Sequence, residues 1–123
     1  MPLNPVLTYR DPRAALDFLH KAFGFEAVNV YDADDGSVAH AELRFGDGIV
    51  MLGTARNSGV MGGLGPSAVY VTVQDPDAHH ARAVEAGAEI VLPVTDQDYG
   101  SREYAAKDPE GNLWSFGTYE AKA

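Results

Sequence analysis

The stretch Asp11-Pro12-Arg13-Ala14 decides the fold, because its Asp-Pro-x-Ala pattern returns as Asp75-Pro76-Asp77-Ala78, an offset of 64 positions (75 − 11). A second landmark keeps nearly the same spacing and the same order. Gly24-Phe25-Glu26 returns as Gly87-Ala88-Glu89, an offset of 63 positions (87 − 24). Landmarks that recur in order at almost one offset indicate an internal duplication. Each copy has ~60 residues, too few to enclose a good core alone, so we expect the two copies to pack together.

Each copy opens with the signals of a strand followed by a helix. In the first copy, Leu7–Tyr9 predicts a short strand. Asp11 then caps a helix that has Pro12 at its first position, where the missing N–H costs nothing. Gly24 ends this helix. The apolar residues between these limits recur with the helical period on one face: Ala15, Phe18, Leu19 and Ala22.

The remaining elements give an α+β fold made of two βαβββ modules. In the first copy the pattern predicts strands at 37–45 and 49–52, with a turn at Asp34-Asp35-Gly36. In the second copy it predicts a strand at 68–73, a helix at 76–86 and strands at 90–94, 102–107 and 112–119. We expect module one at 1–57, a linker at 58–66 and module two at 67–123, in a single domain of 123 residues. The mixed sheet should curve around a cavity, with the helices on its outer face.

Composition excludes several classes of function. The chain has 18 acidic residues, 9 Lys and Arg residues and a net charge of −9, whereas a protein that follows nucleic-acid phosphates needs a basic face. It contains no cysteine, which removes disulfides, thiolate metal sites and cysteine nucleophiles. The apolar run Ile49–Leu52 is far shorter than the ~18 residues of a membrane span. Because Met1–Pro5 has no features of a signal peptide, we expect a cytoplasmic protein with no nucleic-acid or membrane partner.

The alternation of residues along the strands predicts where a ligand would bind. Ala41, Leu43 and Phe45 are apolar and suit the face that the helices cover. The residues that alternate with these three, which include His40 and Glu42, point to the opposite face. In the second copy the same alternation places Tyr70 on that opposite face, and the sequence therefore predicts a cavity with polar lining.

The sequence resembles the vicinal oxygen chelate superfamily, which groups glyoxalase I, bleomycin-resistance proteins and extradiol dioxygenases. The resemblance covers nearly the whole chain and rests on segments that include 7–11, 40–43 and 108–114. The segment from Tyr99 to Tyr119 is similar to a glyoxalase-like branch whose members mostly have no assigned substrate. The resemblance implies paired βαβββ modules, often in a homodimer, with the ligand inside the curved sheet.

The same resemblance implies where a metal would bind in the enzymes of the family. Its four ligand positions fall near Asn4, Ala68, Met51 or Leu52, and Ser115, where the family has His and Glu. An amide, a methyl group, an apolar side chain and a hydroxyl cannot form a divalent metal site. We therefore expect no cofactor, and the metal-dependent glyoxalase I and extradiol reactions are disfavoured.

His40 and Glu42 form the sharpest candidate pair, since two residues apart on a strand share a face and lie ~7 Å apart. They either line the cavity as a ligand-binding or proton-transfer pair, make a structural hydrogen bond or salt bridge with a neighbour, or help hold a metal. Arg102 either binds an anionic group of the ligand or pairs with surface acids. Trp114 is either ligand contact or core. The candidate ligand-binding residues are His40, Glu42, Tyr70, Arg102, Tyr104, Trp114 and Tyr119.

The leading hypothesis is metal-independent binding of a small molecule by a homodimer of the bleomycin-resistance type. The aromatic candidates and the acidic charge favour a cationic or aromatic ligand. The rival hypothesis is a glyoxalase-like lyase or isomerase in which His40 and Glu42 are catalytic, with or without a divalent metal. A third is an accessory protein whose cavity is filled by its own side chains.

Overall fold

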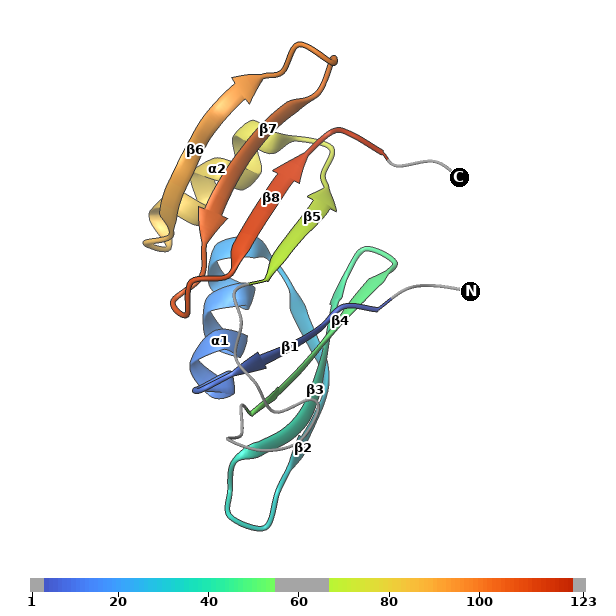
Figure 1. The fold of residues 1–123 in the computed structure, drawn as a ribbon, viewed down its shortest axis with the longest axis vertical. Helices are drawn as coiled ribbons and strands as arrows, with labels where there is room; N and C mark the ends of the chain where they lie inside the picture. The colour runs from blue at the N-terminus through green and yellow to red at the C-terminus, as the bar shows by residue number, and fades with distance from the viewer. Residues whose placement is uncertain (1–3, 55–66, 121–123) are drawn as a thin grey trace. The chain divides into compact units, whose positions relative to one another are not determined.

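The structure of the chain is a computed structural model that describes residues 4–54 and 67–120. The chain divides into two compact units, Met1–Gly65 and Pro66–Ala123. Each unit contains one copy of the βαβββ order (Figure 1). The linker expected at 58–66 lies outside the described residues. The predicted α+β class with two modules is confirmed, and its strands form two four-stranded mixed sheets, one in each unit.

The two units have the same topology. The first contains β1 (Val6–Tyr9), α1 (Pro12–Phe18), the π-helix η1 (Leu19–Phe23), β2 (Glu26–Asp32), β3 (Val38–Phe45) and β4 (Gly48–Thr54), with the strand order β1-β4-β3-β2. The second contains β5 (Ala68–Thr72), α2 (Pro76–Glu85), β6 (Glu89–Asp96), β7 (Arg102–Lys107) and β8 (Leu113–Gly117), with the order β5-β8-β7-β6. In both units the first strand runs parallel to the last, and the other pairs are antiparallel.

The predicted helix cap at Asp11 is confirmed, and Asp75 caps the second helix in the same way. The carboxylates of Asp11 and Asp75 each accept a hydrogen bond of 3.1 Å from the backbone N–H three residues later. In both helices a proline occupies the first turn. Gly24 ends the first helical segment with a φ of 84°, a left-handed conformation that glycine adopts at little cost. The caps therefore begin the helices at the repeated Asp-Pro pairs.

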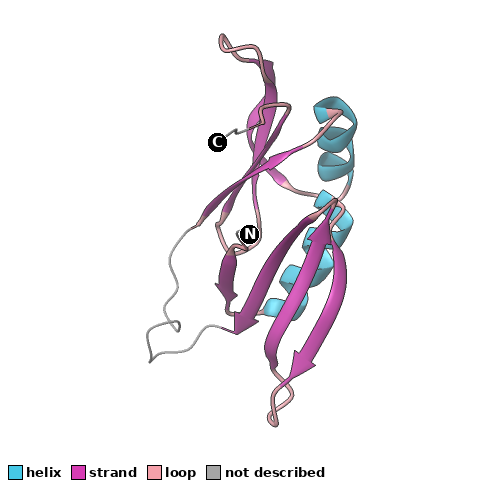
Figure 2. Ribbon diagram, turned by 90° about the vertical axis from the view of Figure 1, so that its right-hand side faces the viewer, coloured by secondary structure: helices cyan, strands magenta, loops and turns pink. Residues whose placement is uncertain are grey.

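The helix of each unit packs against one face of its own sheet and leaves the other face open (Figure 2). In the first unit, Ala41 and Leu43 are buried, as the alternation predicts, while His40 and Glu42 are half-buried on the open face. None of the helices in residues 4–54 and 67–120 is long and apolar enough to cross a membrane.

The core of the second unit is aromatic. Tyr104, Trp114 and Phe116 are fully buried, and the rings of Tyr104 and Phe116 stack with their centroids 5.3 Å apart. His79 of α2 contacts both of these rings, and its Nδ1 is hydrogen-bonded to the Tyr104 hydroxyl. These contacts join α2 to the strands beneath it and fix which face of the second sheet is open.

Candidate functional site

Glu103 lies on the open face of the second sheet, near the start of the inner strand β7. It lies on β7, where it pairs with Gly117 of β8, and Gly117 in turn pairs with Thr72 of β5. Its neighbour Tyr104 points into the core, so the alternation along β7 turns Glu103 to the other side. Only 7% of the residue is exposed. A carboxyl group is therefore nearly buried on a sheet face that the helix does not cover, at the end where β5 and β8 finish.

Three hydroxyl groups donate hydrogen bonds to the Glu103 carboxylate. The Tyr99 hydroxyl donates to Oε1 at 2.6 Å, and the Tyr70 hydroxyl donates to Oε2 at 2.7 Å. Ser101 Oγ donates to the same Oε2 at 2.9 Å. Burial pushes the pKa of Glu103 upward, but the three hydroxyl donors outweigh burial and hold this pKa below its ordinary value. Glu103 is therefore a carboxylate at neutral pH.

The tyrosines around Glu103 are neutral hydroxyl donors. The hydrogen bond to Glu103 raises the pKa of Tyr99 to about 12. Burial raises the pKa of Tyr70, and its bond to the Glu103 carboxylate adds to that shift. The pKa values of the acid and the phenols thus move away from neutrality in opposite directions, which suits a fixed charge better than the transfer of a proton.

Gly117 provides the space in which this cluster forms. A Cβ atom at this position would collide with the Tyr70 hydroxyl and with Cγ of Glu103. The Tyr70 hydroxyl also accepts a hydrogen bond of 3.1 Å from the backbone N–H of Tyr119. Thr72 Oγ1 donates to the Tyr119 carbonyl at 2.7 Å, so two hydrogen bonds hold the Tyr119 backbone beside the cluster.

This cluster forms the wall of an open pocket of about 740 Å³. The lining residues come from β5, from the turn after β6, from β7 and from the segment after β8: Tyr70, Thr72, Tyr99, Glu103 and Tyr119. A smaller pocket of about 290 Å³ lies next to it and shares Tyr99 and Tyr119. Among the described residues, the pocket wall thus combines aromatic surface with the Glu103 carboxylate.

The structure separates the candidate residues of the second unit into two groups. Tyr70 and Tyr119 line the pocket. Tyr104 and Trp114 do not, because the structure places both of these candidates fully buried in the core. Trp114 Nε1 donates to Asp108 Oδ2 at 3.1 Å, so its one polar atom is also used inside the protein.

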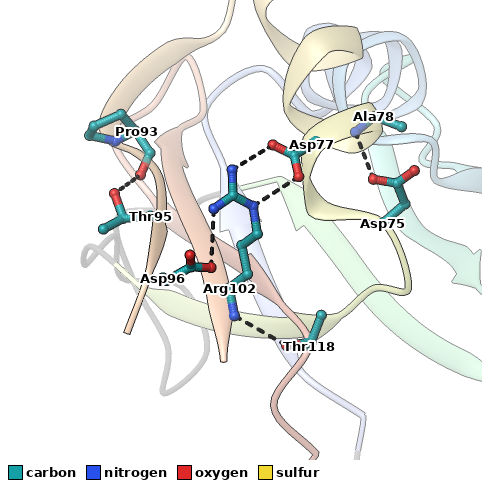
Figure 3. Close-up of polar contacts among 8 residues, drawn as sticks. All are labelled: Asp75, Asp77, Ala78, Pro93, Thr95, Asp96, Arg102 and Thr118. Carbon is teal, nitrogen blue, oxygen red and sulfur yellow. Dashed lines mark hydrogen bonds and ion pairs between the residues drawn. The ribbon is translucent and has the colours of Figure 1, made fainter. Parts of the chain in front are cut away.

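Arg102 is held by two carboxylates on the surface (Figure 3). Its Nε and Nη2 donate to Asp77 of α2 at 2.8 and 2.9 Å, and its Nη1 donates to Asp96 of β6 at 3.1 Å. These bonds raise the pKa of Arg102 and lower that of Asp77. Of the two alternatives for Arg102, the structure therefore favours pairing with surface acids over recognition of an anionic ligand.

His40 and Glu42 lie together on the open face of the first sheet. His40 Nε2 is 3.1 Å from Glu42 Oε2, and Asn29 Nδ2 of β2 donates to Glu42 Oε1 at 2.9 Å. The hydrogen bond from Asn29 and that from His40 lower the pKa of Glu42. The two side chains share one face of the strand, as the alternation predicts, and their contact leaves both structural and chemical roles open to them.

The described residues do not fit the metal site that the family resemblance implies. The expected ligand positions hold an amide, a methyl group, apolar side chains and a hydroxyl (Asn4, Ala68, Met51 or Leu52, and Ser115). Within 4–54 and 67–120, no group of three or more His, Asp or Glu side chains is placed to hold a metal ion. The absence of a metal cofactor remains a prediction.

Sequence reasoning missed Glu103 and Tyr99. The signal for Glu103 was available, because the predicted strand at 102–107 places residues 103 and 104 on opposite faces. With Tyr104 in the core, Glu103 must face the open side. Tyr99 carried no such signal, since it lies in the turn between β6 and β7 and reaches Glu103 only through the fold of that turn.

Comparison with known proteins identifies the class that this fold defines. The sequence profile of the Glyoxalase/Bleomycin resistance protein/Dioxygenase superfamily matches residues 3–116. The crystal structure of TioX from Micromonospora sp. ML1 is 36% identical, covers 98% of this chain and 99% of its own, and superposes with a TM-score of 0.85. The chain therefore belongs to the glyoxalase/bleomycin resistance protein/dioxygenase superfamily.

Other relatives extend this likeness without adding a function. An uncharacterized protein of Mycobacterium tuberculosis is 36% identical over an alignment 124 residues long. The alignment covers 94% of this chain and 72% of the relative. The lactoylglutathione lyase from Agrobacterium tumefaciens shares the fold, with a TM-score of 0.74, 19% identity and coverage of 95% and 92% of the two chains. At that identity the likeness shows the fold alone.

Proposed function

We propose that the second unit binds a small molecule with a positive charge or an aromatic ring, without a metal, and sequesters it as bleomycin-resistance proteins do. One observation carries this proposal. The nearly buried Glu103 carboxylate lines an open pocket, yet within residues 4–54 and 67–120 it forms no ion pair with Lys, Arg or His. Buried charges in proteins are ordinarily paired, so a cationic ligand would supply the missing partner.

Two further features support binding rather than acid–base chemistry. The pKa of Glu103 lies below its ordinary value and that of Tyr99 lies near 12, so neither group exchanges protons readily at neutral pH. The net charge of −9 attracts cations to the protein as a whole. A ligand held in this pocket would leave it chemically unchanged.

The test uses two planar dyes of opposite charge, the cation proflavine and the anion fluorescein. We expect fluorescence anisotropy to show binding of proflavine and little binding of fluorescein. Glu103→Gln keeps the shape of the side chain and removes its charge, so proflavine should bind about tenfold more weakly or worse, a loss of ~1.4 kcal/mol or more. Mass spectrometry of the released dye should recover it intact.

The matched control is Glu85→Gln, since Glu85 is an exposed residue of α2 and the change removes the same charge from the protein. It should leave the affinity for proflavine within about twofold, because surface charges are screened by salt. If Glu103→Gln and Glu85→Gln have equal effects, the dye responds only to net charge and the pocket does not bind it.

The contact between His40 and Glu42 supports a second candidate function, a glyoxalase-like lyase or isomerase. Glu42 is hydrogen-bonded to Asn29 through one oxygen and to His40 through the other, which orients the imidazole on the open face of the first sheet. An oriented, half-exposed imidazole is suited to act as a general base.

This alternative is tested by metal analysis of protein purified without chelators and by an assay for lactoylglutathione formation. A stoichiometric divalent ion that is lost in His40→Gln, or product formation that this variant abolishes, would favour the enzyme over the binding protein. If neither is found, the binding proposal is strengthened.

The proposal also includes a homodimer that acts in the cytoplasm and gives resistance to a drug. Exposed apolar side chains on the edge strands support self-association, among them Val28 and Val30 of β2 and Val91 of β6. Light scattering on the purified chain measures the mass directly. Growth of a sensitive bacterium that expresses the chain, on a panel of cationic drugs, tests resistance, which Glu103→Gln should abolish.

A further inference from the structure

Beside Glu103, the ring of Tyr119 stands at right angles to the ring of Tyr70 and to that of Tyr99. The rings of Tyr70 and Tyr119 have centroids 6.2 Å apart and an angle of 88° between their planes. Those of Tyr99 and Tyr119 are 6.3 Å apart at 90°. The three residues are 40–60% exposed although they line the pocket. Ring walls that meet at right angles form a corner that encloses a compact cationic group.

The carboxylate in this corner has few sites left for a hydrogen-bond donor. A carboxylate accepts about four hydrogen bonds, and Glu103 already receives three from its own protein. A primary ammonium or guanidinium group has only the one remaining site for an N–H group, and any further N–H donor would have to displace a hydroxyl. A cation without N–H groups gains the attraction of the charge and leaves the three hydroxyl bonds in place.

The same hydroxyl bonds favour the attraction between the rings and a cation. Tyr70 and Tyr99 donate their protons toward a negative charge, which increases the electron density of both phenol rings. The faces of electron-rich aromatic rings attract cations within ~6 Å of the ring centre. The ring of Tyr119 is positioned from its backbone, which is hydrogen-bonded to the Tyr70 hydroxyl and to Thr72.

We propose that the corner formed by Tyr70, Tyr99, Tyr119 and Glu103 is an aromatic cage for a quaternary ammonium group. This inference rests on the proposed function, because it names the chemical class that the same pocket selects. The pocket of about 740 Å³ is much larger than a trimethylammonium group, so the remainder of the ligand extends along it. A quaternary ammonium group spreads its positive charge over its methyl groups, so it can contact the three rings and the carboxylate at the same time.

The test compares three probes of the complete chain by calorimetry or NMR titration. Choline carries the quaternary ammonium group, 3,3-dimethylbutan-1-ol has the same shape without the charge, and ethanolamine carries a primary ammonium group. We expect choline to bind about tenfold more tightly than either of the others, since only choline combines methyl groups with charge. Equal binding of choline and its uncharged analogue would overturn the cage.

Variants of Tyr119 separate the role of the ring from that of the fold. Removal of one ring in Tyr119→Leu should weaken choline binding roughly two- to fivefold, whereas Tyr119→Phe, which keeps the ring, should bind like the wild type. Tyr31→Leu is the control, because Tyr31 is a similarly exposed tyrosine (55%) on the first unit. If Tyr119→Leu binds choline as tightly as the Tyr31→Leu control, the ring does not contribute and the inference is wrong.

The dye experiment keeps this inference distinct from the proposed function. If proflavine binds in a Glu103-dependent manner and choline does not bind, the pocket prefers planar cations, so the cage fails and the proposed function stands. If neither cation binds, both fail. If choline binds and Glu103→Gln abolishes its binding, both are supported.

Discussion

The two units place different chemistry at corresponding positions of the same fold. Ala41 pairs with Leu52 in the first sheet, as Tyr104 pairs with Phe116 in the second. The residue that precedes each of these positions faces the open side, and it is His40 in the first unit and Glu103 in the second. Duplication thus preserved the strand register while the two open faces acquired different side chains.

The difference arises from what surrounds each position. Glu103 receives hydroxyl donors from three other residues and is 7% exposed, and it lines a pocket. His40 contacts the neighbouring Glu42 on its own strand, and its side chain is 40% exposed. Next to His40, β3 also has a β-bulge: Ala39 has no partner on β2, because Tyr31 pairs with His40 and Asp32 pairs with Val38. The shared strand register therefore determines which face of the sheet each side chain points to, and the surrounding residues determine its burial and its hydrogen bonds.

The largest expected effect comes from a core position that holds a larger side chain in the second unit than in the first. Trp114 and Val50 occupy corresponding positions, because Trp114 pairs with Ala106 and Val50 pairs with Leu43. Trp114→Ala should lower the free energy of unfolding by about 3–5 kcal/mol, and Val50→Ala by about 2 kcal/mol. Urea denaturation measures both. Tyr119→Ala should change the free energy of unfolding by less than about 0.5 kcal/mol. A loss as large as that of Trp114→Ala would contradict the assignment of Tyr119 to the pocket.

The next effect concerns the glycines beside the two open faces. Gly117→Ala places a methyl group against the Tyr70 hydroxyl and Glu103, and should lower the free energy of unfolding by about 1–3 kcal/mol and weaken proflavine binding. Gly53→Ala brings its Cβ to 3.3 Å from the Ala39 carbonyl oxygen, a contact that a small shift relieves, so the loss should stay below about 1 kcal/mol. Equal losses in the two variants would show that the space at Gly117 is not special.

A smaller effect is expected in the dependence of stability on pH. The pKa of Glu103 in the folded chain lies below the ordinary value of 4.5, so its ionised form stabilises the fold above pH 4.5. This contribution is lost as the pH falls through the lower, folded-state pKa. Glu103→Gln should therefore flatten the decline in stability below about pH 4.5, measured by denaturation across roughly pH 3 to 6.

Glu42→Gln is the comparison for that pH effect. Hydrogen bonds from Asn29 and His40 also lower the pKa of Glu42, so the change has the same sign. Glu42 is more exposed, and solvent screens it, so its substitution should flatten the curve less than that of Glu103. If Glu42→Gln flattened the pH dependence more than Glu103→Gln, ionisation of Glu42 would contribute more to the stability of the fold than ionisation of Glu103.

The smallest expected effect concerns the exposed ion pair that each helix makes with a strand of its own unit. Arg13 of α1 binds Asp32 at the end of β2 at 2.6 Å, whereas Asp77 of α2 binds Arg102 at the start of β7. Both pairs are exposed, so Arg13→Ala and Arg102→Ala should each lower the free energy of unfolding by about 0–1 kcal/mol. Thermal denaturation at low and high salt checks this. A salt-insensitive loss in either variant would show packing rather than charge.

Much of the fold follows from residues that are close together in the sequence. The Asp-Pro caps, the terminating Gly24 and the predicted strand at 102–107 match the structure because each depends on a few neighbouring side chains. Alternation also predicted that Ala41 and Leu43 face the core. The sequence did not separate the buried Tyr104 and Trp114 from the tyrosines at the pocket, because aromatic character alone does not tell core from pocket.

The sequence by itself determined a duplicated α+β module, its superfamily and the acidic charge of the surface. Only the tertiary structure decided which polar residue faces a pocket. Glu103 meets Tyr70 from 33 positions away, and the Tyr119 backbone meets the Tyr70 hydroxyl from 49 positions away. Local sequence sets dihedral angles and the direction of side chains, whereas a binding site requires side chains from separate strands to meet across a sheet, and that depends on strand order and register.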